Sequence, residues 1–409
     1  MRRDIRVDGS RLSLRLIKLA EVGAIPGGGA CRLALTDADK DGRDLVVRWM
    51  RELGLAVSID AIGNVIGIRK GTADGPPVMT GSHIDTVATG GRYDGCFGVL
   101  AGLEVVASLN QAGVVTRRPL AVAFFTNEEG GRFQPDMFGS LVYSGGLALE
   151  RALATVTIDG TVVGDELARI GYAGCAAVGR PRVHAFVELH IEQGPVLQAE
   201  QFRIGAVESV QGISWIEFTL SGQSNHAGTT PMRMRHDAAY VAAAIVAFAR
   251  RLALDIGGNQ VATVGSLVLS PNVINVIADH ALLTVDLRNT DNDRLQEAER
   301  RLLAFVGETA SVEGVAVQHR SLVRFDPVAF APDLVARVEA IAGEFGLPVK
   351  RLPSGAGHDA QMLAAVCPTC MIFVPSVNGI SHNVQEYTSA DDLCAGADVL
   401  LQLLLELAE

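Results

Sequence analysis

The chain has 409 residues, of which 48% are hydrophobic and 20% are charged, and its formal net charge is −11. Single domains usually hold roughly 100–200 residues, so this length predicts two domains or one domain with a large insertion. The apolar content excludes an intrinsically disordered chain. The acidic balance offers no positive surface to nucleic acid or to an anionic membrane, and we expect neither as a partner.

The start of the chain, MRRDIRVDGSRLSLRL, lacks the continuous apolar stretch of a secretory signal. No run of about 18 apolar residues follows, so we expect no membrane span. The six cysteines are scattered and do not form the pattern of a disulfide framework. Together these features predict a cytoplasmic protein. The 44 glycines predict many tight turns and close backbone approaches.

The first 210 residues alternate between helical and extended patterns. Helical spacing occurs at 41–53 and 97–110, and extended or continuous apolar stretches occur at 64–68, 77–81 and 119–126. Apolar strands that are separated by helices are typical of a sheet covered on both sides. We therefore predict an α/β domain with a mostly parallel sheet and helices on both faces.

The pattern changes near residue 211. Six elements follow in the order strand, helix, strand, strand, helix, strand, at 212–220, 237–256, 261–269, 279–288, 291–307 and 314–324. This order is that of a ferredoxin-like α+β module. After residue 327 the alternation resumes, with a strand at 371–376 and a closing helix at 389–407. We predict one α/β domain, 1–210 and 327–409, interrupted by the inserted module 211–326.

Five of the nine histidines lie at Gly-rich or Asx-rich junctions, where sites are usually built, whereas the other four lie in ordinary helix or strand patterns. The five are His83, His190, His226, His358 and His382.

The segment GSHIDTVATGGRYDGCFG contains the first cluster of polar residues. His83 and Asp85 are two residues apart, so on extended backbone both side chains point to one face. Asp85 could then accept a hydrogen bond from one imidazole nitrogen while the other nitrogen binds a metal ion. Asp94 follows in a glycine-dense turn that can bring its carboxylate to the same ion.

Glu128 and Glu129 follow directly after the apolar run 119–126. Adjacent carboxylates at the end of a buried strand repel each other unless a cation is near. We predict that one ligates a metal ion while the other is the general base for a metal-bound water. His190, in VELHIEQGP, and His382, in GISHNVQEY, follow two further strands. Three histidines with an aspartate and a glutamate suit two Zn²⁺ or Mn²⁺ ions.

Eight motifs, in this order over nearly the whole chain, closely resemble the hydantoinase/carbamoylase group of dinuclear metal amidases in the M20 metallopeptidase-like superfamily. They are GSHIDTV, GGRYDGCFGVLAG, TNEEGGRF, ELHIEQGP, SNHAGTTPM, INVIADHALLTVDLRN, SGAGHDAQ and SHNVQEY. The resemblance implies a metal-dependent exopeptidase-like catalytic domain with an inserted ferredoxin-like dimerisation domain. The group includes N-carbamoyl-L-amino-acid hydrolases, allantoate and ureidoglycolate amidohydrolases and β-ureidopropionases.

The resemblance also implies a role for each matching residue. His83 and His190 would bind one metal ion, Glu129 and His382 the other, and Asp94 would bridge the two. The ions would be Zn²⁺ or Mn²⁺, with Co²⁺ and Ni²⁺ as further candidates.

The catalytic residues that the resemblance implies are Glu128 as general base, Asp85 as the residue that orients His83, and His226. His226 would stabilise the oxyanion in the site of a neighbouring subunit, so the active unit would be a homodimer formed through the inserted domain. The substrate-binding positions would be Gln193, Asn275, Arg288, Gly357 and His358. Arg288 would hold a substrate carboxylate, because its planar fork matches that group as a lysine would not.

The resemblance, with these residues, implies an amidohydrolase that cleaves the carbamoyl C–N bond of an N-carbamoyl-L-amino acid. Allantoate, ureidoglycolate or a β-ureido acid is the alternative substrate, because the motifs do not fix the residues of the substrate pocket. An alternative from another class is a metal-stabilised or ligand-binding protein without catalysis. The intact Glu128 and the complete ligand set argue against that alternative.

Overall fold

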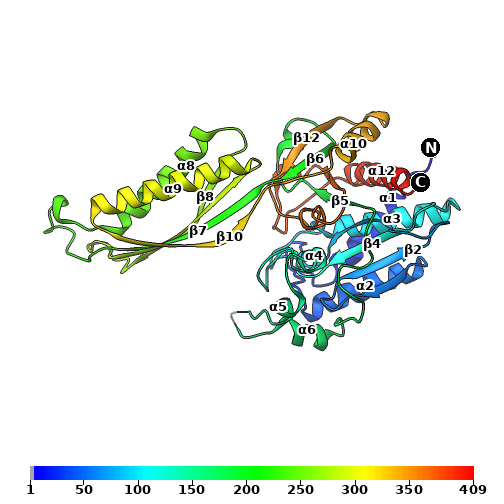
Figure 1. Ribbon diagram of the computed structural model, residues 1–409, viewed down its shortest axis with the longest axis horizontal. Coiled ribbons are helices and arrows are strands. Elements are labelled where there is room, and N and C mark those ends of the chain that lie inside the picture. The colour runs from blue at the N-terminus through cyan, green and yellow to red at the C-terminus, as the bar shows by residue number, and fades with distance from the viewer. Residues whose placement is uncertain (1–3, 158) are drawn as a thin grey trace. The chain divides into compact units, whose positions relative to one another are not determined.

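The computed structural model describes residues 4–157 and 159–409, and the chain divides into two compact units (Figure 1). Unit 1 comprises Met1–Glu208 and Phe330–Glu409, and unit 2 comprises Ser209–Ala329.

Unit 1 is built on a nine-stranded sheet with the order β1-β2-β4-β3-β5-β13-β6-β11, in which β12 also pairs with β6. Its strands are β1 (Ala56–Ile59), β2 (Val65–Arg69), β3 (Val78–His83), β4 (Leu120–Phe125), β5 (Ala185–Ile191), β6 (Ile204–Val210), β11 (Val328–Ala329), β12 (Val349–Ser354) and β13 (Thr369–Val374). The two residues of β11 and the last two of β6 belong by sequence to unit 2, and they pair with each other in this sheet.

The prediction was a mostly parallel sheet, and the four central strands β4, β3, β5 and β13 do run parallel. Every residue of these four strands is buried, as expected for strands that are covered on both faces. The strands at both margins pair antiparallel instead. At one margin the cause is local, because the connection 60–64 between β1 and β2 is a short turn that permits only a hairpin.

The helices of unit 1 are α1 (Gly9–Ala20), α2 (Asp37–Glu52), α3 (Cys96–Gln111), α4 (Phe138–Ser144), α5 (Leu149–Leu153), α6 (Val163–Ile170), α7 (Val196–Ala199), α10 (Pro332–Glu344), α11 (Asp359–Leu363) and α12 (Ala390–Leu407). Helix α3 is buried along nearly its whole length and packs on β3, β5 and α12. Within residues 4–157 and 159–409, no helix combines the length and the apolarity needed to cross a membrane.

Unit 2 has the element order β7 (Gly212–Ser221), α8 (Ala238–Ile256), β8 (Val261–Ser270), β9 (His280–Asn289), α9 (Asn292–Glu313) and β10 (Ala316–Phe325). The four strands form an antiparallel sheet with the order β10-β7-β9-β8. Figure 1 shows α8 and α9 together on one face of this sheet. The core of unit 2 lies between this sheet and the two helices. Alternate strand residues, such as Phe218 and Leu283, pack there against the apolar faces of both helices.

Helix α9 is longer than the sequence predicted. The prediction ended it at residue 307, a glycine, whereas the helix continues to Glu313. A glycine inside a helix costs only about 1 kcal/mol relative to alanine, which tertiary packing can offset. The helix stops at Gly314 instead, whose φ of 68° is the left-handed conformation that commonly ends helices.

Candidate functional site

The predicted ligands of unit 1 lie at the carboxyl ends of neighbouring parallel strands. His83 is the last residue of β3, His190 is the last but one of β5, Glu129 follows β4, and His382 lies in the loop after β13. Asp94 lies in the turn that leads into α3. Loops from adjacent parallel strands converge at this edge of a sheet, which is why sites form there.

Asp94 lies between two pairs of these residues. Its Oδ1 is 3.1 Å from His190 Nε2 and 3.6 Å from His83 Nε2. Its Oδ2 is 3.3 Å from His382 Nε2, which is also 3.2 Å from Glu129 Oε2. The residues thus form two groups that share Asp94, and within each group the ligand atoms lie within 4.8 Å of one another. A bridging carboxylate requires this arrangement.

The two buried histidines are oriented by main-chain carbonyl groups. His83 Nδ1 is 3.0 Å from the Asp85 carbonyl oxygen, and His190 Nδ1 is 2.8 Å from the Ile191 carbonyl oxygen. A ring nitrogen that donates to a carbonyl leaves the other nitrogen with a lone pair for a metal ion. In both rings that other nitrogen is the Nε2 atom near Asp94, and in His190 this atom accepts the N–H of Gly95 at 3.1 Å.

The Asp85 side chain has other partners than the predicted His83. Its carboxylate does not contact His83, and instead accepts the backbone N–H groups of Glu128 and Glu129, each at 3.3 Å. The alternation of side chains applies only along the strand, and β3 ends at His83, so Asp85 lies beyond it. Asp85 therefore orients His83 through its main chain and holds the two glutamates through its side chain.

The electrostatics of the site favour cations. Burial lowers the pKa of His83, but the carboxylates of Glu128 and Asp94 outweigh burial and raise that pKa well above its usual range. Hydrogen bonds with Asp94 and Glu129 raise the pKa of His382 to about 10. Burial raises the pKa of Asp94, but its three histidine partners outweigh burial and hold that pKa well below its usual range.

Glu128 and Glu129 diverge, as the predicted division of roles requires. Glu129 lies beside His382, whereas Glu128 Oε2 is 3.3 Å from His83 Nε2. Burial raises the pKa of Glu128 well above its usual range, and the side chain is 8% exposed. The loop is fixed by Met137, whose N–H donates to the Glu128 carbonyl at 2.7 Å. A buried carboxylate with a raised pKa is suited to proton transfer near neutral pH.

The predicted substrate-binding residues of unit 1 also lie near these ligands. Gln193 donates from Nε2 to Asp94 Oδ2 at 2.8 Å, and its Oε1 is buried without a hydrogen-bond partner among the described residues. His358 is buried, and its ring lies edge-on to the His190 ring with centroids 4.6 Å apart. Gly357 precedes it, and an added Cβ would come within 2.9 Å of the Met137 side chain.

Sequence reasoning missed a buried carboxylate at the site, that of Glu188. Glu188, two residues before His190, accepts the Ser82 hydroxyl at 2.6 Å and the Ala360 N–H at 2.7 Å. With His190 and His358 it forms a third group of possible ligands. Both Glu188 oxygens and the His358 Nε2 already have hydrogen-bond partners, so we interpret this group as a supporting network.

Three predicted site residues belong to unit 2. His226 and Asn275 are exposed and lie on neighbouring segments, because Ala227 N donates to the Asn275 carbonyl at 3.0 Å. The His226 Nδ1 accepts the N–H groups of Gly228 at 3.1 Å and Thr229 at 3.3 Å. A neutral imidazole that accepts at Nδ1 carries its proton on Nε2, which is therefore a donor.

Arg288 is the third predicted site residue of unit 2, and it lies on β9, where it pairs with Asp286 of the same strand. Its Nε is 3.1 Å from both Asp286 carboxylate oxygens, and its Nη2 is 2.9 Å from Oδ2. Both residues lie on the sheet face opposite to the core residues Val285 and Leu287.

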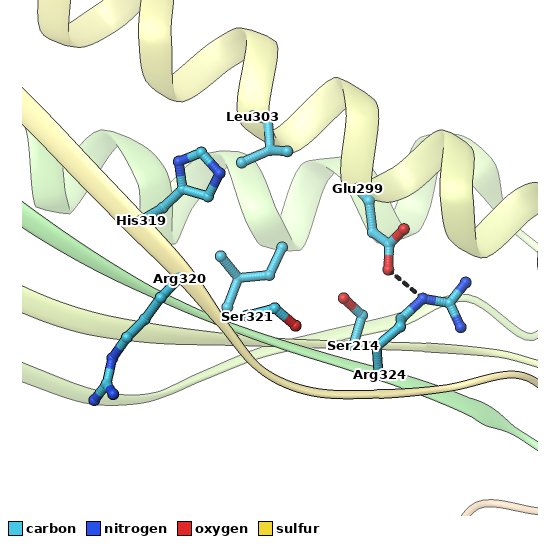
Figure 2. A pocket seen from close by; sticks show the side chains of 8 residues that line it. Ser214, Glu299, Leu303, His319, Arg320, Ser321 and Arg324 are labelled. Atoms are coloured by element: carbon cyan, nitrogen blue, oxygen red, sulfur yellow. Dashed lines mark ion pairs between the residues drawn. The ribbon is translucent and has the colours of Figure 1, made fainter.

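A cavity of about 320 Å³ in unit 2 lies between α9 and strands β7 and β10 (Figure 2). The Glu299–Arg324 ion pair, at 2.7 Å, lies on one side of it, and His319 and Leu303 lie on the other. None of its lining residues is a predicted site residue. We therefore place the candidate site at the strand ends of unit 1.

The donor set fits divalent cations. Imidazole nitrogens and carboxylate oxygens are ligands that Zn²⁺ and Mn²⁺ accept. The shared Asp94, the Nδ1–carbonyl contacts and the close approach of several carboxylates all agree with cation binding.

Comparisons with known proteins show the family of the chain. Residues 79–406 match the model of peptidase family M20/M25/M40. An N-carbamoyl-L-amino-acid amidohydrolase of Rhizobium meliloti is 43% identical over 405 residues, which cover 99% of this chain and 97% of that protein. The chain belongs to peptidase family M20/M25/M40.

Further relatives place the chain within the family. A crystal structure of a hydantoinase/carbamoylase family amidase from Burkholderia multivorans has a TM-score of 0.95 and 47% identity over 99% of both chains. An allantoate amidohydrolase of Bacillus subtilis is 34% identical over 95% of both chains. The resemblance to the hydantoinase/carbamoylase group is confirmed, and the protein is an amidohydrolase of that group.

Proposed function

We propose that this amidohydrolase cleaves the carbamoyl C–N bond of an N-carbamoyl-L-amino acid. The observation that carries the proposal is the position of Asp94 between two ligand pairs, with Glu128 beside His83. The similarity to the Rhizobium meliloti enzyme supports the substrate class. Water adds to the ureido carbonyl, and the C–N bond to the amino acid breaks. The products are the L-amino acid and carbamic acid, which breaks down to CO₂ and ammonia.

Two divalent cations, Zn²⁺ or Mn²⁺, would be held by five residues. The ligands would be His83 and His190 on one ion, Glu129 and His382 on the other, and Asp94 on both. Co²⁺ and Ni²⁺ suit the same donors. Bound cations would supply Lewis acidity that polarises the carbonyl and makes water more acidic.

Glu128 would be the general base. It takes a proton from the attacking water and returns the proton to the leaving nitrogen of the amino acid. Its buried position and raised pKa support this role, because a carboxylate that is too acidic returns no proton near neutral pH. Asp85 would keep Glu128 in place through the backbone N–H groups of the glutamate pair.

Unit 2 would complete the site in a homodimer, with His226 serving the site of a second copy. The protonated Nε2 of His226 would donate to the oxyanion that forms on the carbonyl oxygen. Arg288 would bind the substrate carboxylate through the other edge of its guanidinium group, whose orientation Asp286 fixes. Gln193, Asn275, Gly357 and His358 would form the rest of the substrate pocket.

Allantoate or another ureido acid is the second candidate substrate, favoured by the similarity to the Bacillus subtilis enzyme. Ammonia release should be measured with a panel of N-carbamoyl-L-amino acids, their D enantiomers, allantoate, ureidoglycolate and β-ureidopropionate. We expect the highest kcat/KM with an N-carbamoyl-L-amino acid and little turnover of its D enantiomer. A higher kcat/KM with allantoate or another ureido acid would contradict this choice of substrate.

A further inference from the structure

A second buried carboxylate, from Glu386, lies behind the proposed ligands. Its Oε1 accepts the backbone N–H of Tyr93 at 2.9 Å and that of Asp94 at 3.2 Å. Its Oε2 accepts the hydroxyl of Ser381 at 3.0 Å. The residue is 4% exposed. Glu386 therefore joins the turn that carries Asp94 to the residue directly before His382.

These two segments are far apart in sequence and come from different loops, one before α3 and one after β13. Other contacts are also found around the two segments. Ser381 and Gln193 donate from their side chains to the Asp94 carboxylate, and Thr89 Oγ1 donates to the His382 carbonyl. Among these links, only the Glu386 bonds reach the backbone of Asp94. A change at Glu386 should therefore alter the distance between Asp94 and His382.

A glycine, Gly91, leaves space for the Glu386 carboxylate. Gly91 lies against it, and an added Cβ at Gly91 would come within 2.1 Å of Glu386 Oε1 and 2.3 Å of its Cδ. Any other residue at this position would push the carboxylate away from the Asp94 backbone. The glycine in the GGRYDG motif thus has a packing reason that involves Glu386.

Two carboxylates lie within hydrogen-bond distance of the Ser381 hydroxyl. It is 3.0 Å from Glu386 Oε2 and 3.2 Å from Asp94 Oδ2, but it has a single proton. When Asp94 uses Oδ2 for a cation, Glu386 remains as the acceptor for that proton. Glu386 thus provides a hydrogen-bond acceptor that lets Asp94 turn to a cation without leaving Ser381 unpaired.

We propose that Glu386 is a positioning residue that holds the bridging carboxylate of Asp94 and the His382 loop at the spacing that two divalent cations require. This inference rests on the proposed metal ligands. Glu386 contacts the backbone of one proposed ligand and the neighbour of another, so it acts through them. When ionised, this buried carboxylate also favours cations at the site.

The test is cation binding, measured on the full-length protein without substrate. Glu386→Ala removes all three bonds, whereas Glu386→Gln keeps an amide oxygen for the two N–H groups and removes the charge. The matched control is Glu104→Gln. Glu104 is also a buried carboxylate that accepts one backbone N–H, from Asp8, and one serine hydroxyl, from Ser108, but it lies on α3 among arginines.

Protein stripped with a chelator is titrated with Co²⁺, and the bound ions per chain and the visible absorption spectrum are recorded. We expect Glu386→Ala to bind one of its two ions about 10- to 100-fold more weakly, with a changed Co²⁺ spectrum. Glu386→Gln should bind both ions with a smaller loss of affinity, and Glu104→Gln should match the parent protein in both readouts.

Two results would overturn the proposal. One is wild-type affinity for two ions in Glu386→Ala, and the other is an equal loss in Glu104→Gln, which would reflect lower stability alone. If Glu386→Ala does not fold, wild-type affinity and spectrum in Glu386→Gln, despite the lost charge, would likewise count against it. Because no substrate is used, a protein that binds two ions but hydrolyses no ureido acid would refute the proposed function and leave this proposal standing.

Discussion

Cation binding should release protons from the histidines of the site. His382 Nε2 lies 3.3 Å from Asp94 Oδ2 and 3.2 Å from Glu129 Oε2, and these contacts raise the pKa of its ring to about 10. At pH 7.5 this ring therefore carries a proton on the nitrogen that a metal ion would use. The ion can bind only after that proton has left. Affinity for the cation should accordingly rise with pH.

The magnitude follows from the two contacts and from the exposure of the ring. At about 3.2 Å, one pair of unit charges in a water-like dielectric is worth roughly 1.3 kcal/mol. The side chain of His382 is 51% exposed, so solvent screening reduces the total for two pairs to about 1–2 kcal/mol. This energy corresponds to a loss of about 5- to 30-fold in cation affinity, at a pH where the ring is protonated, relative to the same ring without the two carboxylate contacts.

The assay is isothermal titration calorimetry with Zn²⁺ or Mn²⁺ at several pH values between 6.5 and 9, in two buffers of different ionisation enthalpy. We expect release of at least one proton per chain and an affinity that increases with pH. His382→Asn should release fewer protons, whereas His184→Asn, at a histidine outside the site, should not change the count. Cation binding that is independent of pH and releases no proton would refute the reasoning.

Three further changes test other parts of the structure. Gly95→Ala places a Cβ within 2.3 Å of the His83 ring, and we expect loss of bound metal in elemental analysis. Gly113→Ala is the control, because Gly113 has a similar φ of 65° and an added Cβ there would have no atom within 4 Å. This variant should keep its metal despite about 1–2 kcal/mol of backbone strain. Arg43→Met breaks the ion pair with Asp39, whose two side chains are both 0% exposed. The free energy of unfolding in urea should fall by about 3–5 kcal/mol. A loss below about 1 kcal/mol would contradict this expectation. Arg288→Lys should lower kcat/KM by about tenfold or more, mainly through a higher KM, and an unchanged KM would exclude Arg288 from carboxylate binding.

Much of the fold could be predicted because its elements have strong local signals. The continuous apolar run at 119–126 became the buried strand β4, and the order of elements in unit 2 followed from alternating and helical periods. The antiparallel margins of the sheet were harder to foresee, because β6 and β11 pair through residues far apart in sequence. The end of α9 was misplaced because Gly307 and Gly314 look alike in sequence, and only the second has a left-handed backbone.

Candidate site residues could be predicted where polar residues stand at or soon after the end of a strand, as His83 and Glu129 do. The role of the Asp85 side chain could not, because it depends on where β3 ends and how the Glu128 loop turns. Glu386 stood in the SHNVQEY motif without a predicted role, since nothing in its sequence neighbourhood reveals the Asp94 turn on which it acts.

The central claim is that Glu128 moves the proton in a site whose cations are held by other residues. The most direct measurement is kcat/KM of Glu128→Gln for an N-carbamoyl-L-amino acid, with bound metal quantified in the same sample. We predict a full complement of metal and a kcat/KM about 10²- to 10⁴-fold lower, because the base is lost and the ligands remain. A variant that binds its metal and turns over at a near wild-type rate would contradict the account.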